Sequence, residues 1–467
     1  MSRGAPIEHT AVSTVHGPLL VVEQAAGVGW DEVAEIRLSS GEVRHGVVLD
    51  VSRDLAVVEV YEGTSGLRRG ALRVSFTGSP MTIPVGDGWL GRVVNGRGDP
   101  LDDGPPVFGA AAHPVHGRAI NPAARATPVE PILTGVSVID GLATLVRGQK
   151  LPVFSVGGLP HLELAAQVAA QATAGDEPFA VIFAAMGITS ADAAMVRDTL
   201  EERAAAGDLA LFLNTAGEPL IERILTPRIA LTVAEHLAFE LGRHVLVVMA
   251  DMTSYCEAVR EVSAARGETP SRRGYPGYLY SDLASLYERA GRIRGRAGSI
   301  TQLPVLTMPG GDITHPVPDL TGYITEGQLV LSQQAHLRGI YPPFEPLHSL
   351  SRLMRLGAGP GRTREDHLEL AAQLYALVAE AQHVADLADV VGADALSDAE
   401  RAYLAFRSRF DAEFAAQGQT ESRTLDETLD RAWNVASMLP RQELSMLSEP
   451  TLDRRYRGED AAPRPAR

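Results

Sequence analysis

The spacing of apolar residues divides the chain into three parts. In the first part, residues 10–75, apolar and polar positions alternate with a period of two. Tight turns near Gly41 and Asp54 separate the alternating runs, which lie at residues 33–39, 43–51 and 55–61. Short alternating strands joined by tight turns are typical of a small closed antiparallel barrel. We therefore expect residues 1–76 to form an N-terminal β-barrel domain.

In the second part, residues 132–350, apolar runs alternate with amphipathic segments. The apolar runs predict strands at residues 179–184, 209–214 and 245–250. The amphipathic segments predict helices near residues 190–206, 229–241 and 281–292. This alternation predicts a mostly parallel sheet with helices on both faces, whose ligands bind beyond the carboxyl ends of the strands. We expect a central α/β domain of the nucleotide-binding type over residues 77–355.

In the third part, residues 356–453, the pattern becomes helical. Capping boxes, or close variants of them, predict helix starts at Thr363, Ser397 and Thr424. The second of these helices carries an aromatic stripe of Phe406, Phe410 and Phe414, which is far more typical of a packed core than of a cofactor site. The fold class is therefore multidomain α/β with a C-terminal helical bundle. The charged, proline-containing residues 454–467 are predicted to be a disordered tail.

One stretch of the central domain has the layout of a phosphate-binding strand, loop and helix. Residues 153–156 read as a buried strand, residues 157–160 as a tight turn containing Gly157 and Gly158, and residues 162–170 as a helix. A functional phosphate loop of the form GxxxxGK[ST] needs a lysine for the phosphates and a hydroxyl for magnesium. The architecture therefore predicts a nucleotide-binding domain.

The loop lacks the side chains that bind phosphate and magnesium. Where Gly-Lys-Thr would open the helix, the chain has His161, Leu162 and Glu163, and Lys150 is the only lysine in the sequence. A glutamate at a helix N-terminus suits the helix dipole and can act as a cap, but it repels a triphosphate. We therefore interpret the loop as a degenerate phosphate loop.

Three other patterns are candidate sites. Residues 86–91 match GxGxxG by letter, but they lack the following helix that a dinucleotide site requires. His113 and His116 form an HxxH pair without a further metal ligand in the sequence nearby. Asp251, which follows an apolar strand, has two interpretations: a magnesium-linked carboxylate, or the N-cap of the helix that begins at Met252.

Composition narrows the class of protein. The formal net charge of −16 argues against a nucleic-acid-binding protein, whose phosphate contacts call for a basic surface. The single cysteine, Cys256, excludes an intramolecular disulfide and fits a reducing compartment. No apolar run approaches the length of a membrane span. We expect a soluble cytoplasmic protein that can still dock on a membrane complex.

Several long strings along the chain carry a family resemblance. The strings are LGRVVNGRGDPLD at 90–102, SVGGLPHLELAA at 155–166 with GLPH at 158–161, MADMTSY at 249–255, GYPGYLYSD at 274–282, TMP at 307–309 with DITHP at 312–316, DLTGYITEGQ at 319–328 and SLSRLM at 349–354. They resemble those of the non-catalytic, regulatory B (beta) subunits of the vacuolar/archaeal-type (V/A-type) rotary ATPases and ATP synthases, and the resemblance covers nearly the whole chain. Catalytic subunits of this family keep Gly-Lys-Thr in the loop, so its loss matches the B type.

The resemblance implies a hexamer in which such chains alternate with catalytic A subunits around a rotating shaft. Nucleotide and magnesium would lie at the interfaces, held mainly by the catalytic subunit, with no cofactor belonging to this chain alone. Arg352 would act in trans as an arginine finger on the neighbour's nucleotide, with Ser351 beside it at the nucleotide. Tyr341 would stack on an adenine at the second, non-catalytic interface.

The resemblance also implies contacts beyond the ring. Asp312, in a loop where this chain has Gly-Gly-Asp and the family a more polar Asn-Asp-Asp, would face the central rotor shaft, as would residues 266–273. Further partners would be the peripheral stalk and, indirectly, the membrane sector that moves ions. The complex would lie on the inner face of the membrane.

Two alternatives remain open from the sequence. The degenerate loop could still hydrolyse nucleotide by unusual chemistry, although the missing lysine and hydroxyl argue against it. The chain could also be a freestanding interaction protein built on an inactivated ATPase domain, in which case it would not join a mixed ring with a catalytic subunit.

Overall fold

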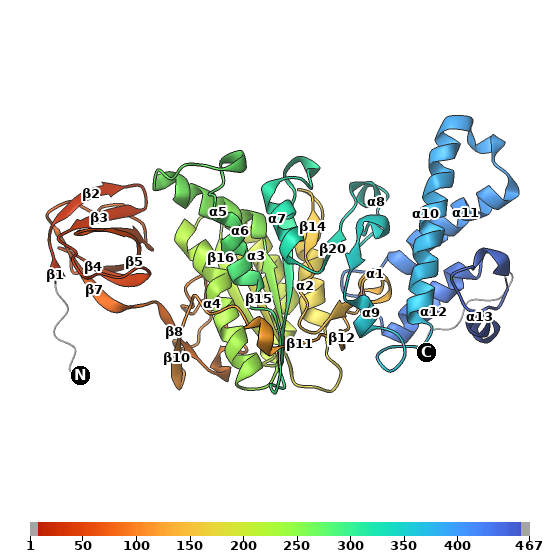
Figure 1. Cartoon of the computed structure of the whole chain (residues 1–467), viewed down its shortest axis with the longest axis horizontal. Helices are drawn as coiled ribbons and strands as arrows, with labels where there is room; N and C mark the ends of the chain where they lie inside the picture. The colour runs from red at the N-terminus through yellow and green to blue at the C-terminus, as the bar shows by residue number, and fades with distance from the viewer. Residues whose placement is uncertain (1–7, 459–467) are drawn as a thin grey trace.

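The computed structural model describes residues 8–458. Figure 1 shows a β-domain at the N-terminal end, an α/β domain in the middle and a group of helices at the C-terminal end. This order of three domain types is the one that the sequence predicts. None of the helices within residues 8–458 is long and apolar enough to cross a membrane.

Seven antiparallel strands form the N-terminal domain. They are β1 (Glu8–His9), β2 (Val12–His16), β3 (Leu19–Glu23), β4 (Glu32–Leu38), β5 (Val43–Ser52), β6 (Leu55–Val60) and β7 (Leu72–Pro80). Their order in the sheet is β1-β7-β4-β5-β6-β3-β2, so the two edge strands are consecutive in the chain and the sheet curls nearly closed. Alternate residues such as Val58 and Val60 fill its interior. The predicted barrel is confirmed.

The central sheet has the strand order β21-β20-β14-β19-β17-β15-β16-β9. The strands on this path are β9 (Val93–Asn95), β14 (Val153–Ser155), β15 (Phe179–Ile188), β16 (Leu209–Thr215), β17 (His244–Ala250), β19 (Ser299–Thr307), β20 (Gly327–Val330) and β21 (Leu350–Ser351). Every pairing along this path is parallel except that of β21 with β20. The mostly parallel sheet is therefore confirmed.

Helices cover both faces of this sheet. On one face lie α1 (Ser137–Leu142), α2 (His161–Gln171) and α3 (Ser190–Ala205); on the other lie α4 (Leu220–Phe239), α5 (Met252–Ala265) and α6 (Leu279–Tyr287). Strand β15 shows why both faces are apolar: Val181 and Phe183 join the first core, and Ile182 and Ala184 join the second. Three short helices, α7 (Pro316–Ile324), α8 (Gln333–Leu337) and α9 (Met354–Gly357), complete the domain.

Two predicted helix limits were wrong. Helix α4 begins at Leu220 rather than at residue 229, and it continues through Pro227 even though proline lacks the amide donor that an interior helical residue supplies. The residues around Pro227 are buried, so packing against the sheet outweighs this loss. Helix α6 ends at Tyr287 rather than at residue 292, because Gly291 already begins strand β18 (Gly291–Ile293).

The C-terminal domain contains α10 (His367–Val391), α11 (Asp398–Arg409), a π-helical turn (Phe410–Ala415), α12 (Leu425–Ala436) and α13 (Glu449–Arg455). The capping boxes of Ser397 and Thr424 are confirmed. The predicted box at Thr363 was wrong, because α10 begins at His367 without a side-chain cap. Arg454 and Arg455 of the predicted tail lie in α13, and residues 459–467 fall outside the described residues.

The C-terminal helices and the central domain share one core. Phe406, Phe410 and Phe414 belong to the same buried cluster as residues of α1, α2 and the central strands. Hydrogen bonds cross the same boundary, as the side-chain amide of Gln417 donates to the Gly135 carbonyl oxygen at 2.6 Å. The aromatic stripe is therefore core, as predicted, and the bundle is not an independent folding unit.

His367, on the C-terminal helix α10, contacts the central domain, and its burial predicts that the stability of the fold depends on pH. Its Nε2 lies 3.1 Å from the Gly141 carbonyl oxygen and its Nδ1 lies 2.9 Å from the Thr363 hydroxyl, which itself accepts from the Gly359 amide at 2.7 Å. Burial lowers the pKa of His367 to about 4, so the folded ring stays neutral at a pH where the unfolded ring, with a pKa near 6.5, binds a proton. The folded state therefore loses stability as the pH falls from about 6.5 towards 4.

Lowering the pH from 7.5 to 5 should cost about 2 kcal/mol of unfolding free energy through this group. The measurement is urea unfolding of wild type and His367→Gln at both pH values. The variant cannot titrate at this position, so its loss should be smaller by that amount. Equal losses in the two proteins would contradict the assignment.

Candidate functional site

The loop after β14 has the backbone of a phosphate loop. Strand β14 ends at Ser155, the chain turns through Gly157 and Gly158, and α2 begins at His161. Gly158 has a φ of 88°, a conformation that favours glycine, and nothing lies within 4 Å of a Cβ built at either glycine. The predicted strand, loop and helix are therefore present.

The side chains at the start of α2 are not those that bind a phosphate. Leu162, at the position of the phosphate-loop lysine, is only 7% exposed and packs in the core. Glu163 lies in the first turn, but α2 has no side-chain cap, so the predicted capping role of Glu163 was wrong. His161 Nδ1 lies 2.8 Å from the Leu159 carbonyl oxygen, which ties the imidazole to its own loop.

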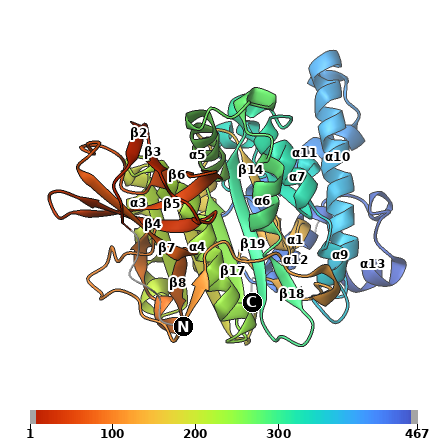
Figure 2. The same ribbon diagram turned by 60° about the vertical axis from the view of Figure 1, so that its left-hand side comes forward.

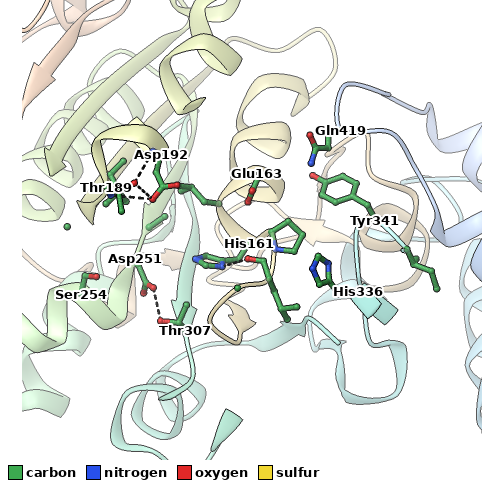
Figure 3. A pocket seen from close by; sticks show the side chains of 18 of the residues that line it. His161, Glu163, Thr189, Asp192, Asp251, Ser254, Thr307, His336, Tyr341 and Gln419 are labelled. Carbon is green, nitrogen blue, oxygen red and sulfur yellow. Dashed lines mark hydrogen bonds between the residues drawn. The ribbon is translucent and has the colours of Figure 1, made fainter. Parts of the chain in front are cut away.

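A cavity of about 650 Å³ opens in front of this loop. Figure 3 shows His161 and Glu163 in the middle of the view, with Asp251 and Thr307 on one side of them and Tyr341 on the other. The structure thus brings Gly158, His161, Leu162, Glu163 and Tyr341 together, whereas Ser351 and Arg352 are not part of its lining.

Three acidic residues, Glu163, Asp192 and Asp251, line this cavity. Asp192 is engaged with Thr189 in the capping box of α3. Asp251 accepts from the Thr253 amide at 2.6 Å and from the Thr307 hydroxyl at 2.8 Å, so it is the N-cap of α5. Burial raises the pKa of Asp251, against the opposing effect of those hydrogen bonds and of His161. The N-cap interpretation of Asp251 is therefore confirmed.

These residues do not fit a magnesium triphosphate. Glu163, Asp192 and Asp251 repel phosphate, and the cavity lacks a lysine. Lys150 does not replace it, because its ammonium group is buried between Glu288 at 3.0 Å and Glu326 at 2.9 Å. Within the described residues, no group of three or more His, Cys, Asp or Glu side chains is placed to hold a metal ion. The residues that line the cavity therefore include neither a lysine nor an arginine that could pair with a phosphate.

Tyr341 lines the cavity on the side that faces the C-terminal domain. Its hydroxyl donates to Oε1 of Gln167 on α2 at 2.8 Å, and its carbonyl oxygen accepts from the Gln417 amide at 2.7 Å. Burial raises the pKa of Tyr341, and Glu163 adds to the increase. The phenol is therefore bonded to α2, and the backbone of Tyr341 is bonded to the C-terminal domain.

Arg352 lies elsewhere, on a firmly held piece of backbone. The Ser351 hydroxyl is buried; it donates to the Thr144 carbonyl oxygen at 3.0 Å and accepts from the Gln149 side-chain amide at 3.0 Å. The Arg352 amide donates to the Glu326 carbonyl oxygen at 3.0 Å. The Arg352 side chain is exposed, and among the described residues none is bonded to its guanidinium.

Arg352 and the degenerate loop lie at opposite ends of adjacent strands. Strands β14 and β20 are parallel, and the loop follows the end of β14. Arg352 instead lies beside Glu326, at the start of β20, because β21 runs antiparallel to β20 and pairs Ser351 with Gly327. One copy of the chain therefore presents the two features at opposite ends of the sheet.

The two predicted rotor-facing segments lie side by side. Asp312 accepts from Arg273 at 2.6 Å and from the Thr314 hydroxyl at 2.7 Å, and Arg272 donates to Asp319 at 2.9 Å. The bonds from Thr314 and Arg273 lower the pKa of Asp312 to about 2. The loop of Asp312 and the end of the second segment, at Arg272 and Arg273, therefore form one exposed, charged surface.

Sequence reasoning missed several residues of the cavity. Thr189 and Asp192 form a capping box whose spacing could have placed them at a helix start beside a strand end. His336, on α8, and Gln419, in the C-terminal domain, had no such signal, because only tertiary packing brings them to the loop.

Comparisons with known proteins agree with this architecture. Three family models match in order: "ATP synthase alpha/beta family, beta-barrel domain" over residues 12–78, "ATP synthase alpha/beta family, nucleotide-binding domain" over residues 135–351, and "C-terminal domain of V and A type ATP synthase" over residues 356–456. The B subunit of the A-type ATP synthase of Aeropyrum pernix is 54% identical over 447 residues, which are 95% of this chain and 96% of the relative. The chain belongs to the B-type (beta chain) family of A-type and V-type ATP synthase subunits.

Other members support the same assignment. The V-type ATP synthase beta chain of Halothermothrix orenii is 54% identical over 453 residues, which are 97% of this chain and 98% of the relative. A solved structure of the unique ATP synthase subunit NeqB from Nanoarcheaum equitans matches with a TM-score of 0.71 and 39% identity, over 91% of this chain and all of that one. The resemblance drawn from the sequence strings is therefore confirmed, and this B-type chain carries the nucleotide-binding domain of the family.

Proposed function

We propose that this B-type chain is the non-catalytic, regulatory member of a hexameric ring, in which it alternates with catalytic A subunits and places Arg352 at its neighbour's nucleotide. The observation that carries the proposal is the state of Arg352: an exposed guanidinium without a bonded partner among the described residues, on a backbone fixed by Ser351 and Glu326. An exposed arginine without a binding role would not need a backbone that is held this firmly.

The chemistry follows from charge. A guanidinium that enters a closed interface offsets the charge that develops on a transferring phosphoryl group. The neighbour would supply the phosphate loop, the lysine and the magnesium site that this chain lacks. Because Arg352 and the degenerate loop lie at opposite ends of adjacent strands, each would serve a different face of the subunit.

Ser351 and Tyr341 take supporting roles in this proposal. A direct contact of the Ser351 hydroxyl with nucleotide would require its bonds to Thr144 and Gln149 to break, so we assign it to holding the backbone of Arg352. Tyr341 would offer its ring to an adenine at the second interface, at the mouth of the acidic cavity. ATP or ADP and magnesium would then belong to the ring rather than to this chain alone.

The remaining contacts complete the proposal. The charged surface around Asp312 and Arg273 would face the central rotor shaft. The ring would be held by a peripheral stalk, and through these parts it would couple ATP synthesis or hydrolysis to ion movement on the inner face of the membrane.

Exposed apolar residues near Arg352 predict the surface through which this chain contacts its neighbour in the ring. Leu350 is 54% exposed, and Leu347 and Leu356 are exposed as well. Leu350→Glu should leave the thermal unfolding of the isolated chain unchanged, because the side chain makes little contact there, but it should prevent assembly by burying a charge at the interface. The measurement is the mass of the complex after co-expression with the catalytic subunit.

Co-expression with the catalytic subunit and the ATPase activity of the isolated chain distinguish the proposal from its two alternatives. A freestanding interaction protein would remain unassembled with the catalytic subunit even as wild type. An unusual nucleotide hydrolase would show strong magnesium-dependent ATPase activity as the isolated chain, and this activity would survive substitution of Leu162 and Glu163. Either result would overturn the proposal.

A further inference from the structure

A second cavity, of about 300 Å³, lies between the barrel and the central domain. Figure 2 shows the barrel packed beside α4 and α5, and the cavity is enclosed by strands β5 and β6 on one side and by these two helices on the other. It is separate from the cavity at the degenerate loop and shares none of that cavity's residues.

Glu59 is the unusual residue of this cavity. It lies on β6 between Val58 and Val60, which face the barrel core, so its side chain points out of the barrel towards α4 and α5. Glu59 is 0% exposed, and neither carboxylate oxygen has a hydrogen-bond partner among the described residues. A buried carboxylate without a partner is costly, and such groups in native proteins call for an explanation.

The other charged groups of the cavity leave Glu59 without a close counter-ion. Arg228 is paired with Asp282. His116 lies 3.6 Å from Asp31, but burial lowers the pKa of His116, so it remains neutral at pH 7. Arg266, the C-cap residue of α5, opposes the rise in the pKa of Glu59 through its charge, yet it bonds to Glu268 at 3.3 Å and its own buried Nε has no partner among the described residues. Of the five charged lining residues three are acidic and two are basic, so the cavity carries a net charge of about −1 when Glu59 is ionised.

The rest of the wall is mostly apolar, apart from the phenols of Tyr61 and Tyr278. Leu49 lies on the barrel side, and Ile224, Leu225 and Val262 lie on the helix side. The described residues contain no cluster of three His, Cys, Asp or Glu side chains that could hold a metal ion. A ligand for this cavity therefore needs one positive charge and an apolar body.

We propose that this cavity is a binding site for a small organic cation, an amidinium or guanidinium attached to an apolar body, with Glu59 as its anchor. Two parallel N–H groups of such a cation match the two unpaired oxygens of one carboxylate, the bidentate geometry of the strongest charge-assisted hydrogen bonds. The apolar body would lie against α4 and α5. A ligand here would touch both domains and so couple the barrel to the nucleotide-binding domain.

The test is calorimetric titration of the full chain with benzamidine at pH 8 and pH 6. Burial raises the pKa of Glu59 to about 7, while benzamidine stays protonated at both pH values. Glu59 is therefore mostly ionised at pH 8 and mostly protonated at pH 6, and binding should be about tenfold tighter at pH 8. Glu59→Gln, which keeps the shape, should weaken binding at pH 8 by at least about tenfold.

Two controls make the result specific. Glu23→Gln, at the exposed end of β3, should bind as wild type does, and neutral benzyl alcohol should bind far more weakly than benzamidine. The proposal is overturned if benzamidine does not bind, if Glu59→Gln binds it equally well, or if benzyl alcohol binds as tightly. If Glu59→Gln fails to fold, the difference in wild-type affinity for benzamidine between pH 8 and pH 6 tests the role of Glu59 instead.

Discussion

Replacing Arg352 by alanine is expected to lower ATP turnover by the assembled complex by about 10³–10⁵-fold while the ring stays intact. Its side chain is exposed and not bonded to another described residue, so its removal breaks no contact within the chain. The loss would fall on the transition state, where the guanidinium offsets developing charge. The measurement is steady-state ATPase activity together with the mass of the purified complex.

Two variants sharpen this prediction. Arg355→Ala removes another exposed arginine nearby, on α9, and should leave turnover within a few-fold of wild type. Arg352→Lys should not restore activity, because an ammonium group lacks the planar fork that reaches two phosphate oxygens. Near-normal turnover of Arg352→Ala in an intact ring would rule out the finger.

Phe410→Ala is expected to destabilise the central and C-terminal domains together, by about 3–5 kcal/mol of unfolding free energy. Phe410 is buried between Phe406 and Phe414, with ring centroids 6.0 and 5.2 Å away, in the core that both domains share. A cavity at this point removes packing from both sides of the domain boundary. The measurement is urea unfolding followed by separate probes in each domain.

The control for this variant is Val390→Ala, near the end of α10, where the side chain is 83% exposed. It should change the unfolding free energy by less than about 0.5 kcal/mol. If Phe410→Ala lowers the stability of the C-terminal helices alone, the two domains have separate cores and do not unfold as one unit.

Regular periodicity made most of the fold predictable. The barrel strands and the central strands follow from alternating and continuous apolar runs, and two capping boxes mark the starts of α11 and α12. Helix α4 was less predictable, because local rules place a helix start near Pro227 and burial overrides them. The domain limits at residues 76, 355 and 453 stay predictions, and β7 runs past the first of them to Pro80.

The candidate sites were predictable only where a local pattern carries them. The missing lysine of the degenerate loop and the string around Arg352 are readable in the sequence. Gln419 reaches the loop cavity through tertiary packing, which leaves no local signal. Glu59 occupies a polar position of an alternating strand, and in the sequence it looks like any solvent-facing residue, because the domain that covers it lies far along the chain.

The central part of the proposed function is that Arg352 stabilises the transition state of the reaction in the neighbouring subunit. This role is tested most directly by trapping the assembled complex with ADP and aluminium fluoride, which mimics the transferring phosphoryl group. The Arg352→Ala complex should bind ADP as wild type does but lose the added affinity that aluminium fluoride gives the wild-type complex. Equal trapping by the two complexes would contradict this role of Arg352.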